Sequence, residues 1–181
     1  MGWLWMSRLH KSSAMKKSIS TSLTNTNIAR ITFLLAETPS KLEALSKPLT
    51  SEQLIQALGD GERSFAETLV HLINSEARTS EAIYLALLVD EPLIADIHPE
   101  RDWGKLLRFD LLEFNDLTAY FKLRRTVLLR ALSSLKEDGW SRCIREKGKK
   151  RKESVYWRAR SLALHEAEHV SELERKVLKR R

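Results

Sequence analysis

Cysteine, glycine and proline are scarce in this chain of 181 residues. The single cysteine, Cys143, excludes an internal disulfide and is typical of a reducing compartment, so we expect a cytoplasmic protein. Six glycines and four prolines leave long stretches free to form helices. No apolar run approaches the ~20 residues that cross a bilayer. The chain suits one domain that can bury its own core.

The formal charge of +7 lies largely at the two ends of the chain. Residues 1–27 carry four basic residues and no acid, and their short apolar start precedes the lysines, the reverse of a secretory signal. We predict a disordered leader over residues 1–27, or alternatively a natural start at Met15. Residues 175–181 add five basic residues, of which 179–181 form a basic tail. The charge therefore predicts neither a nucleic-acid nor a membrane partner for the body, residues 28–178.

The body contains four long stretches in which apolar residues recur at helical spacing. They cover 28–46, 64–89, 110–136 and 153–178, and Pro39 is expected to kink or interrupt the first. Ser64 and Asp110 each precede a glutamate by three residues, the pattern of a capping box that begins a helix. Most connections suit antiparallel neighbours, so we predict an all-α four-helix bundle.

Residues 140–152 connect the third and fourth predicted helices and are rich in lysine and arginine. Glu146 is their only acid, and weak alternation around Gly148 predicts a short basic hairpin or loop. This connector can attract an anionic substrate, although a solvated run of charges is the simpler interpretation.

Three of the five histidines lie on apolar faces of the predicted helices. His165 and His169 are four residues apart, so both rings project from one face of the last helix, where they interrupt a stripe of leucines. His71 lies beside an apolar position of the second helix. Three imidazoles so placed can hold one divalent ion. Three hydrogen-bonded core histidines without an ion are the alternative, and His10 and His98 are interpreted as solvated.

Two glutamates next to these histidines suggest further roles. His165, Glu166 and His169 formally match the H-E-x-x-H motif, in which the glutamate is the general base of a metalloprotease. No third downstream ligand follows, so Glu166 is as readily a solvated helix position. Glu76 lies inward on the second helix and is expected to orient a ligand ring by a hydrogen bond.

In order and spacing these segments resemble the DinB superfamily, over about residues 28–178. The resemblance rests on Leu34–Pro39, on the E-x-x-x-H-L stretch from Glu67 to Leu72, on 117–135 with its two arginines at 124 and 125, on Trp140 before the connector, and on the closing H-x-x-x-H. It implies a four-helix bundle, often dimeric, with a divalent ion on His71, His165 and His169. The basic connector and the Val170–Leu173 stretch depart from the family pattern, which leaves the substrate open.

The superfamily includes bacillithiol transferases and mycothiol-dependent enzymes, so the resemblance implies a metal-dependent, thiol-dependent S-transferase acting on a small molecule. The ion is zinc, nickel, iron or manganese, and a low-molecular-weight thiol is the expected second cofactor. Cys143 is a poor nucleophile candidate because it lies on the connector, although Arg142 and Arg145 favour its thiolate. A non-catalytic metal-binding bundle and a metal-dependent hydrolase remain the alternatives.

Overall fold

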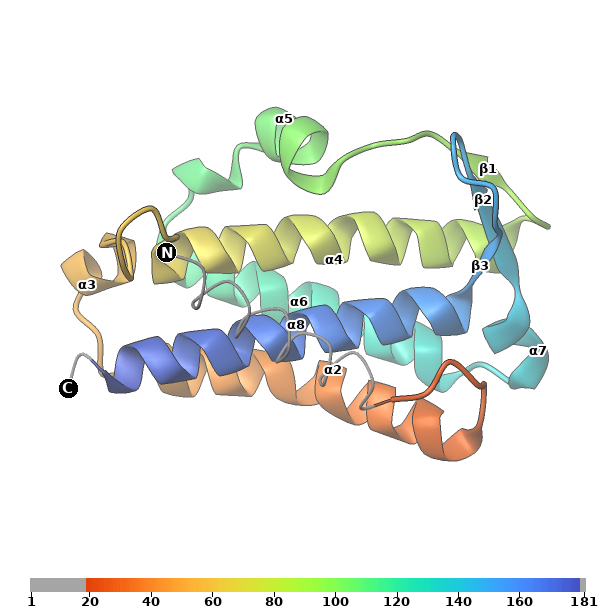
Figure 1. Ribbon diagram of the computed structural model, residues 1–181, viewed down its shortest axis with the longest axis horizontal. Coiled ribbons are helices and arrows are strands. Elements are labelled where there is room, and N and C mark those ends of the chain that lie inside the picture. The colour runs from red at the N-terminus through yellow and green to blue at the C-terminus, as the bar shows by residue number, and fades with distance from the viewer. Residues whose placement is uncertain (1–18, 180–181) are drawn as a thin grey trace, which may run out of the picture.

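The computed structural model describes residues 19–179, which form a bundle of four long helices (Figure 1). These are α2 (Asn25–Ser46), α4 (Phe65–Leu88), α6 (Phe114–Ser133) and α8 (Val155–Leu178). The predicted all-α four-helix bundle is thus confirmed. No helix within residues 19–179 combines the length and the apolarity needed to cross a bilayer.

One of the two predicted capping boxes forms. At the start of α4, Ser64 Oγ accepts a hydrogen bond from the backbone N–H of Glu67, and the Glu67 carboxylate accepts one from the N–H of Ser64. The box predicted at Asp110 is wrong. Arg108 has a left-handed backbone (φ 48°) and pairs with Asp110 in the short helix η2 (Phe109–Leu111), so α6 begins only at Phe114.

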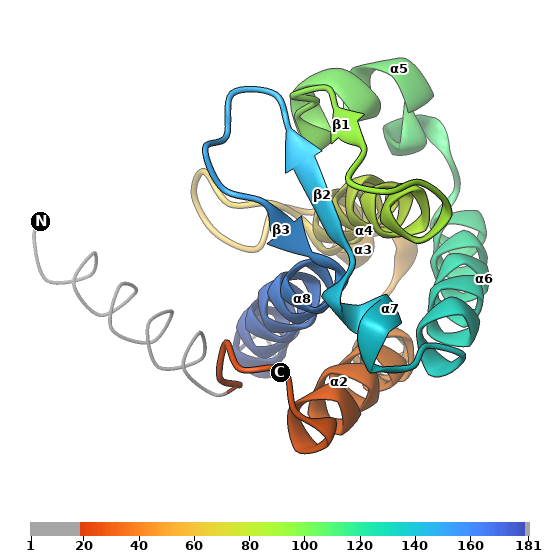
Figure 2. The ribbon, with the colours of Figure 1, turned by 90° about the vertical axis from the view of Figure 1, so that its right-hand side faces the viewer.

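Neighbouring helices in the bundle are not always antiparallel, contrary to the sequence-based expectation. Each of α2 and α4 contacts both α6 and α8, which puts α2 diagonally opposite α4 (Figure 2). Helices α4 and α6 run parallel: Phe65 packs against Phe114 near their first residues, and Glu76 pairs with Arg124 further along. Because α4 and α6 are parallel, the chain between them must run back along the whole bundle before α6 begins.

That connection is the crossover, residues 89–113, which runs back along α4 (Figure 1). It contains β1 (Leu93–Ile94), the π-helical turn η1 (Pro99–Gly104), α5 (Lys105–Leu107) and η2. Arg78 of α4 fastens it by donating hydrogen bonds to the carbonyls of Ala95 and Ile97, at 2.7 and 3.2 Å. The predicted helices left residues 90–109 without any assigned element.

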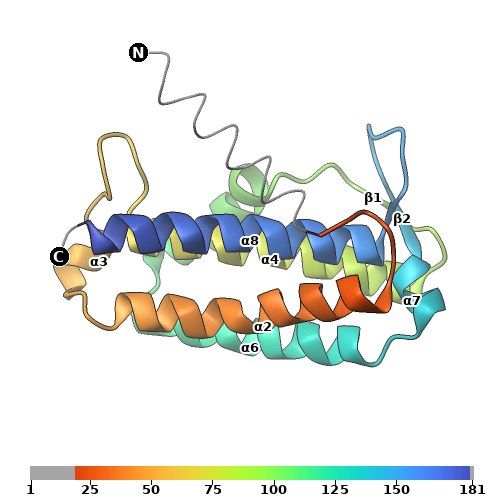
Figure 3. The same ribbon diagram turned by 60° about the horizontal axis from the view of Figure 1, so that its bottom comes forward.

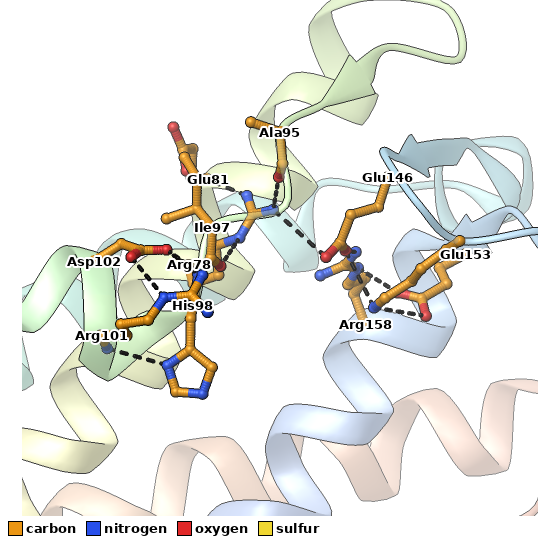
Figure 4. A network of polar contacts seen from close by, with 11 residues as sticks. Arg78, Glu81, Ala95, Ile97, His98, Arg101, Asp102, Glu146, Glu153 and Arg158 are labelled. Carbon is orange, nitrogen blue, oxygen red and sulfur yellow. Dashed lines mark hydrogen bonds and ion pairs between the residues drawn. The ribbon is translucent and has the colours of Figure 1, made fainter.

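The connector forms the predicted hairpin, with β2 (Cys143–Glu146) antiparallel to β3 (Glu153–Ser154). Two features were not predicted: β1 pairs in parallel with β2, and α7 (Glu137–Ser141) follows the end of α6 at Ser133. Arg158 of α8 contacts both Glu146 and Glu153, and all three are less than a tenth exposed (Figure 4). This charge network fastens the hairpin to the bundle, so its acids are buried and paired.

The end of the predicted leader is ordered, which corrects the expected boundary. Ile19 is 1% exposed, Arg160 donates to its carbonyl at 2.7 Å, and Tyr156 donates to the carbonyl of Ser20 (Figure 3 shows this segment leading into α2). Helix α2 already begins at Asn25. Met15 and His10 lie outside the described residues, so for that part of the chain a disordered leader stays a prediction.

Helix α2 continues through Pro39, where a kink or interruption was expected. Proline has no N–H, so the carbonyl of Leu35 loses its usual helical donor. Arg125 of α6 replaces that donor, with its Nη1 2.7 Å from the Leu35 oxygen. A buried guanidinium from a neighbouring helix therefore compensates for the proline.

Candidate metal centre

The three histidines predicted as ligands come together between α4 and α8. His71 Nε2 lies 3.0 Å from Nε2 of His165 and 3.1 Å from Nε2 of His169. The Nε2 atoms of the three rings thus converge on one point. One ligand atom from each ring lies within 4.8 Å of the other two. The four-residue spacing on α8 and the antiparallel packing of α4 against it produce this arrangement.

The geometry fits a divalent ion. Imidazole nitrogens ligate zinc at ~2.0–2.1 Å, so two nitrogens on a tetrahedral ion are about 3.3 Å apart. The observed separations of 3.0 and 3.1 Å are close to that value. Three uncharged ligands leave a fourth coordination position for water or substrate. Whether these residues bind metal stays a prediction that the geometry favours.

The environment keeps the rings uncharged, as metal ligation requires. Burial, reinforced by the neighbouring histidines, lowers the pKa of His165 to about 3 and that of His169 to about 4. Burial also lowers the pKa of His71, although the hydrogen bond that His71 donates to Glu100 opposes this shift. All three are therefore neutral at pH 7, and their lone pairs are available to an ion.

The carboxylate that contacts one of these rings is Glu100, which no sequence pattern predicted. Its Oε1 accepts a hydrogen bond from His71 Nδ1 at 2.7 Å and also pairs with Arg63 at 2.8 Å. A proton on Nδ1 leaves the His71 Nε2 lone pair facing the other rings. Glu100 lies on η1, 29 residues after His71, so only the returning crossover brings them together and no local sequence signal indicates the contact.

The role expected of Glu76 is wrong. It is fully buried and pairs with Arg124 of α6 at 2.5 Å, a distance measured to its Oε2. Arg124 also donates to Ser80 Oγ at 2.8 Å. Glu76 therefore joins α4 to α6 and does not orient a histidine.

Glu166 is neither a general base at the ion nor a solvated position. It is fully buried, and its carboxylate makes a two-pronged contact with the Arg125 guanidinium, at 2.5 and 2.8 Å. Adjacent positions on a helix differ by about 100° in direction, so Glu166 faces the interior beside α2 and α6 while His165 faces α4. The glutamate in this formal match to H-E-x-x-H therefore serves the packing of the helices through its pair with Arg125.

His98, expected to be solvated, is exposed and lies outside the histidine cluster. Its Nδ1 accepts hydrogen bonds from the backbone N–H groups of Glu100 and Arg101, at 3.2 and 3.1 Å. It thereby caps η1, the turn that carries Glu100 to His71.

Two open hollows reach the cluster. The first, here called the front hollow, is about 870 Å³ in volume and lies between α3 (Ser51–Ile55), α4 and the crossover, with His71 and Glu100 in its lining. The second is about 440 Å³ and is lined by His169 and Glu172. Arg63 lines both. A ligand on the cluster can therefore be reached from solvent.

The basic connector lies at the opposite end of the bundle from α3 (Figure 1). Arg142 at its start donates to the carbonyl of Ala86. Ala86 and His71 are fifteen positions apart on α4, which is about 22 Å at the helical rise of ~1.5 Å per residue. The start of the connector, with Arg142 and Cys143, is thus distant from the histidines, whereas Glu146 further along the connector lies 3.9 Å from Arg78, seven positions after His71 on α4.

We expect Glu100→Ala to weaken metal affinity about 10–100-fold, because ligand-orienting carboxylates typically contribute that much. Glu100→Gln retains an acceptor for His71 Nδ1, so its metal affinity is expected to lie between those of the parent and Glu100→Ala. Competition with a fluorescent chelator would measure the affinities, with Glu137→Ala on α7 as a matched control. An affinity unchanged in Glu100→Ala would show that the carboxylate does not orient the ligand.

Comparisons with known proteins agree with the fold. The family model described as the DinB superfamily matches residues 34–173. Among solved structures, the Bacillus subtilis protein YfiT, described as a probable metal-dependent hydrolase with an unusual four-helix bundle topology, superposes with a TM-score of 0.75 at 19% identity. The match covers 86% of this chain and 90% of YfiT. No protein among those with curated functions matches. The chain belongs to the DinB superfamily.

Proposed function

We propose that this protein is a metal-dependent enzyme that acts on a small molecule at the histidine cluster. The observation that carries the proposal is the convergence of three uncharged Nε2 atoms at a point open to two hollows. A purely structural ion would need a fourth protein ligand, and the described residues place no further histidine, cysteine or carboxylate in the cluster.

His71, His165 and His169 would hold the ion. When bound, a divalent ion lowers the pKa of a coordinated water or thiol towards neutrality and makes it a nucleophile. Glu100 holds the proton of His71 at Nδ1, and that hydrogen bond together with the ion pair to Arg63 keeps Glu100 ionised. Imidazoles suit zinc, nickel and iron, and manganese is also accepted, so availability decides the metal.

Between the two nucleophiles, we favour water, and so a hydrolytic reaction. The likeness to YfiT in fold supports it. The start of the basic connector, which was expected to attract an anionic substrate, contacts Ala86, about 22 Å along α4 from His71 by the helical rise. Thiol transfer is the second candidate, because the same cluster would activate a thiol that enters through either hollow. The homodimer implied by the resemblance and the cytoplasmic location expected from the single cysteine stay predictions.

Metal content tests the proposal most directly. We expect elemental mass spectrometry on untagged protein to find about one divalent ion per chain, as one tetrahedral site requires. The ion should be lost in His165→Ala/His169→Ala and retained in Glu137→Ala, a control that removes an exposed side chain on α7, outside the cluster. Protein that takes up no ion on reconstitution would contradict the proposal.

Activity assays then separate the candidate reactions. The metal-loaded protein is expected to hydrolyse members of an ester and amide panel without added thiol, and to lose that activity in His165→Ala/His169→Ala. Turnover that requires an added thiol would favour transfer. An ion without turnover in either panel would favour the non-catalytic alternative, in which the metal only joins α4 to α8.

A further inference from the structure

The turn of the β2–β3 hairpin, residues 147–152, presents positive charge to solvent and no negative charge. Six basic side chains in and beside this turn are exposed: Arg145, Lys147, Lys149, Lys150, Arg151 and Lys152. The two acids next to the turn, Glu146 and Glu153, are instead buried, where Arg158 of α8 contacts both (Figure 4). The hairpin therefore separates its charges, with the acids inside and the bases outside.

The exposed bases outnumber the acids within their reach. Lys149 and Arg151 come within 3.2 to 3.6 Å of the buried carboxylates, but Arg158 already pairs with both of these. Lys152 pairs with Glu91. The other three bases make no ion pair with a residue from 19 to 179, and they are Arg145, Lys147 and Lys150. Such unpaired cations attract an anionic partner.

Trp157, near the start of α8, joins the hairpin to the first described residues. The guanidinium carbon of Arg151 lies 4.2 Å from the centre of the Trp157 ring, and that of Arg160 lies 5.4 Å from it. Arg160 also donates hydrogen bonds to the carbonyls of Ile19 and Ser20, at 2.7 and 3.1 Å. Figure 2 shows β3 and the segment from Ile19, in red, beside the same end of α8.

A second basic segment is joined to this anchored residue. Residues 8–17 contain four bases and no acid: Arg8, Lys11, Lys16 and Lys17. They lie outside the described residues, but Lys17 and Lys16 precede Ile19 by two and three residues, so chain length keeps both within about 11 Å of it. The two basic segments, far apart in the sequence, therefore approach each other at this end of α8.

The residues before the second segment indicate which anionic partner fits. Five of the first six are apolar: Met1, Trp3, Leu4, Trp5 and Met6. Tryptophan favours the boundary between lipid headgroups and acyl chains, and bases beside apolar residues strengthen binding to anionic lipid. A single-stranded nucleic acid would instead need open aromatic rings on which its bases stack, whereas Arg151 already covers the Trp157 ring. The chemistry favours an anionic lipid surface.

We propose that this end of the molecule binds anionic membranes through the exposed bases of residues 145–152 and the bases of residues 8–17, here called the basic surface. The bases attract the lipid headgroups, and Trp3 and Trp5 insert between them. The histidine cluster takes no part, so the proposal does not rest on the proposed function. Sequence patterns predicted no membrane partner, because the contact between Arg160 and Ile19 is what brings the two basic segments together.

Flotation of the full chain with lipid vesicles tests the proposal. We expect vesicles of equal parts phosphatidylcholine and phosphatidylserine to bind about 100-fold more tightly than phosphatidylcholine alone, since each of the three unpaired bases contributes roughly fivefold. Lys147→Gln/Lys150→Gln should weaken binding to the mixed vesicles about 25-fold on the same basis. The matched control, Lys47→Gln/Lys105→Gln, removes two exposed lysines outside the basic surface and should change this affinity less than about twofold, since distant charges are screened.

Tryptophan fluorescence tests the insertion. Emission should shift to shorter wavelength on addition of the mixed vesicles, because Trp3 and Trp5 leave water, and Trp3→Ser/Trp5→Ser should remove most of the shift. Single-stranded and duplex DNA are titrated at the same ionic strength, and binding as tight as that to the mixed vesicles would assign the basic surface to nucleic acid and overturn the proposal. Equal binding to both kinds of vesicle, an affinity unaffected by Lys147→Gln/Lys150→Gln, or the absence of a fluorescence shift would also overturn it.

Discussion

Glu166→Ala is expected to lower the free energy of unfolding by about 3–5 kcal/mol, the cost of leaving one member of a buried ion pair unpaired. Glu166 is fully buried and Arg125 is 2% exposed. With Glu166 removed, the guanidinium keeps only the carbonyl of Leu35 as a hydrogen-bond partner among the described residues. Denaturant unfolding monitored by circular dichroism would measure the change.

A neighbouring substitution provides the control. Glu168→Ala removes a carboxylate two positions away that is not fully buried, and is expected to stay within about 0.5 kcal/mol of the parent, as surface substitutions usually do. Replacing both partners, as in Arg125→Met/Glu166→Met, should recover much of the loss because no buried charge remains. The Leu35 carbonyl beside Pro39 would still lack its donor in that variant. A loss below about 1 kcal/mol for Glu166→Ala would show that the pair is not a main support of the fold.

Metal binding is the second large effect, and we expect it to stabilise the bundle. The three ligands come from α4 and α8, so an ion at this site binds the folded chain and not the unfolded one. At a free concentration a thousand times the Kd, linkage predicts about 4 kcal/mol of added stability. For a domain of this size that corresponds to a rise in Tm of roughly 8–16 °C.

Differential scanning fluorimetry with zinc, nickel or manganese would measure the rise in Tm. His165→Ala/His169→Ala should show little of this rise, whereas Glu137→Ala on α7 should match the parent. The parent treated with a chelator should return to its metal-free Tm. An equal rise in the His165→Ala/His169→Ala variant would mean that the ion binds elsewhere on the chain.

The sequence by itself determined the local elements and the directions in which two of the three clustered histidines, His165 and His169, project. Helical periodicity predicts all four long helices, Ser64 and Glu67 predict where α4 begins, and the hairpin follows from alternation around a glycine. The spacing of His165 and His169 puts both rings on one helix face, because that spacing is about one turn. Pattern within one element is sufficient for such predictions, since the interactions involved span only a few residues.

Tertiary structure alone decided the contacts between elements distant along the chain. The parallel packing of α4 and α6 requires the crossover to return along α4, and that return brings Glu100 to His71. The same packing assigns Glu76 to Arg124 and Glu166 to Arg125, the two glutamates for which the sequence suggested roles at the metal. A helical position fixes the direction of a side chain, but which neighbour occupies that direction depends on how the helices are connected in space.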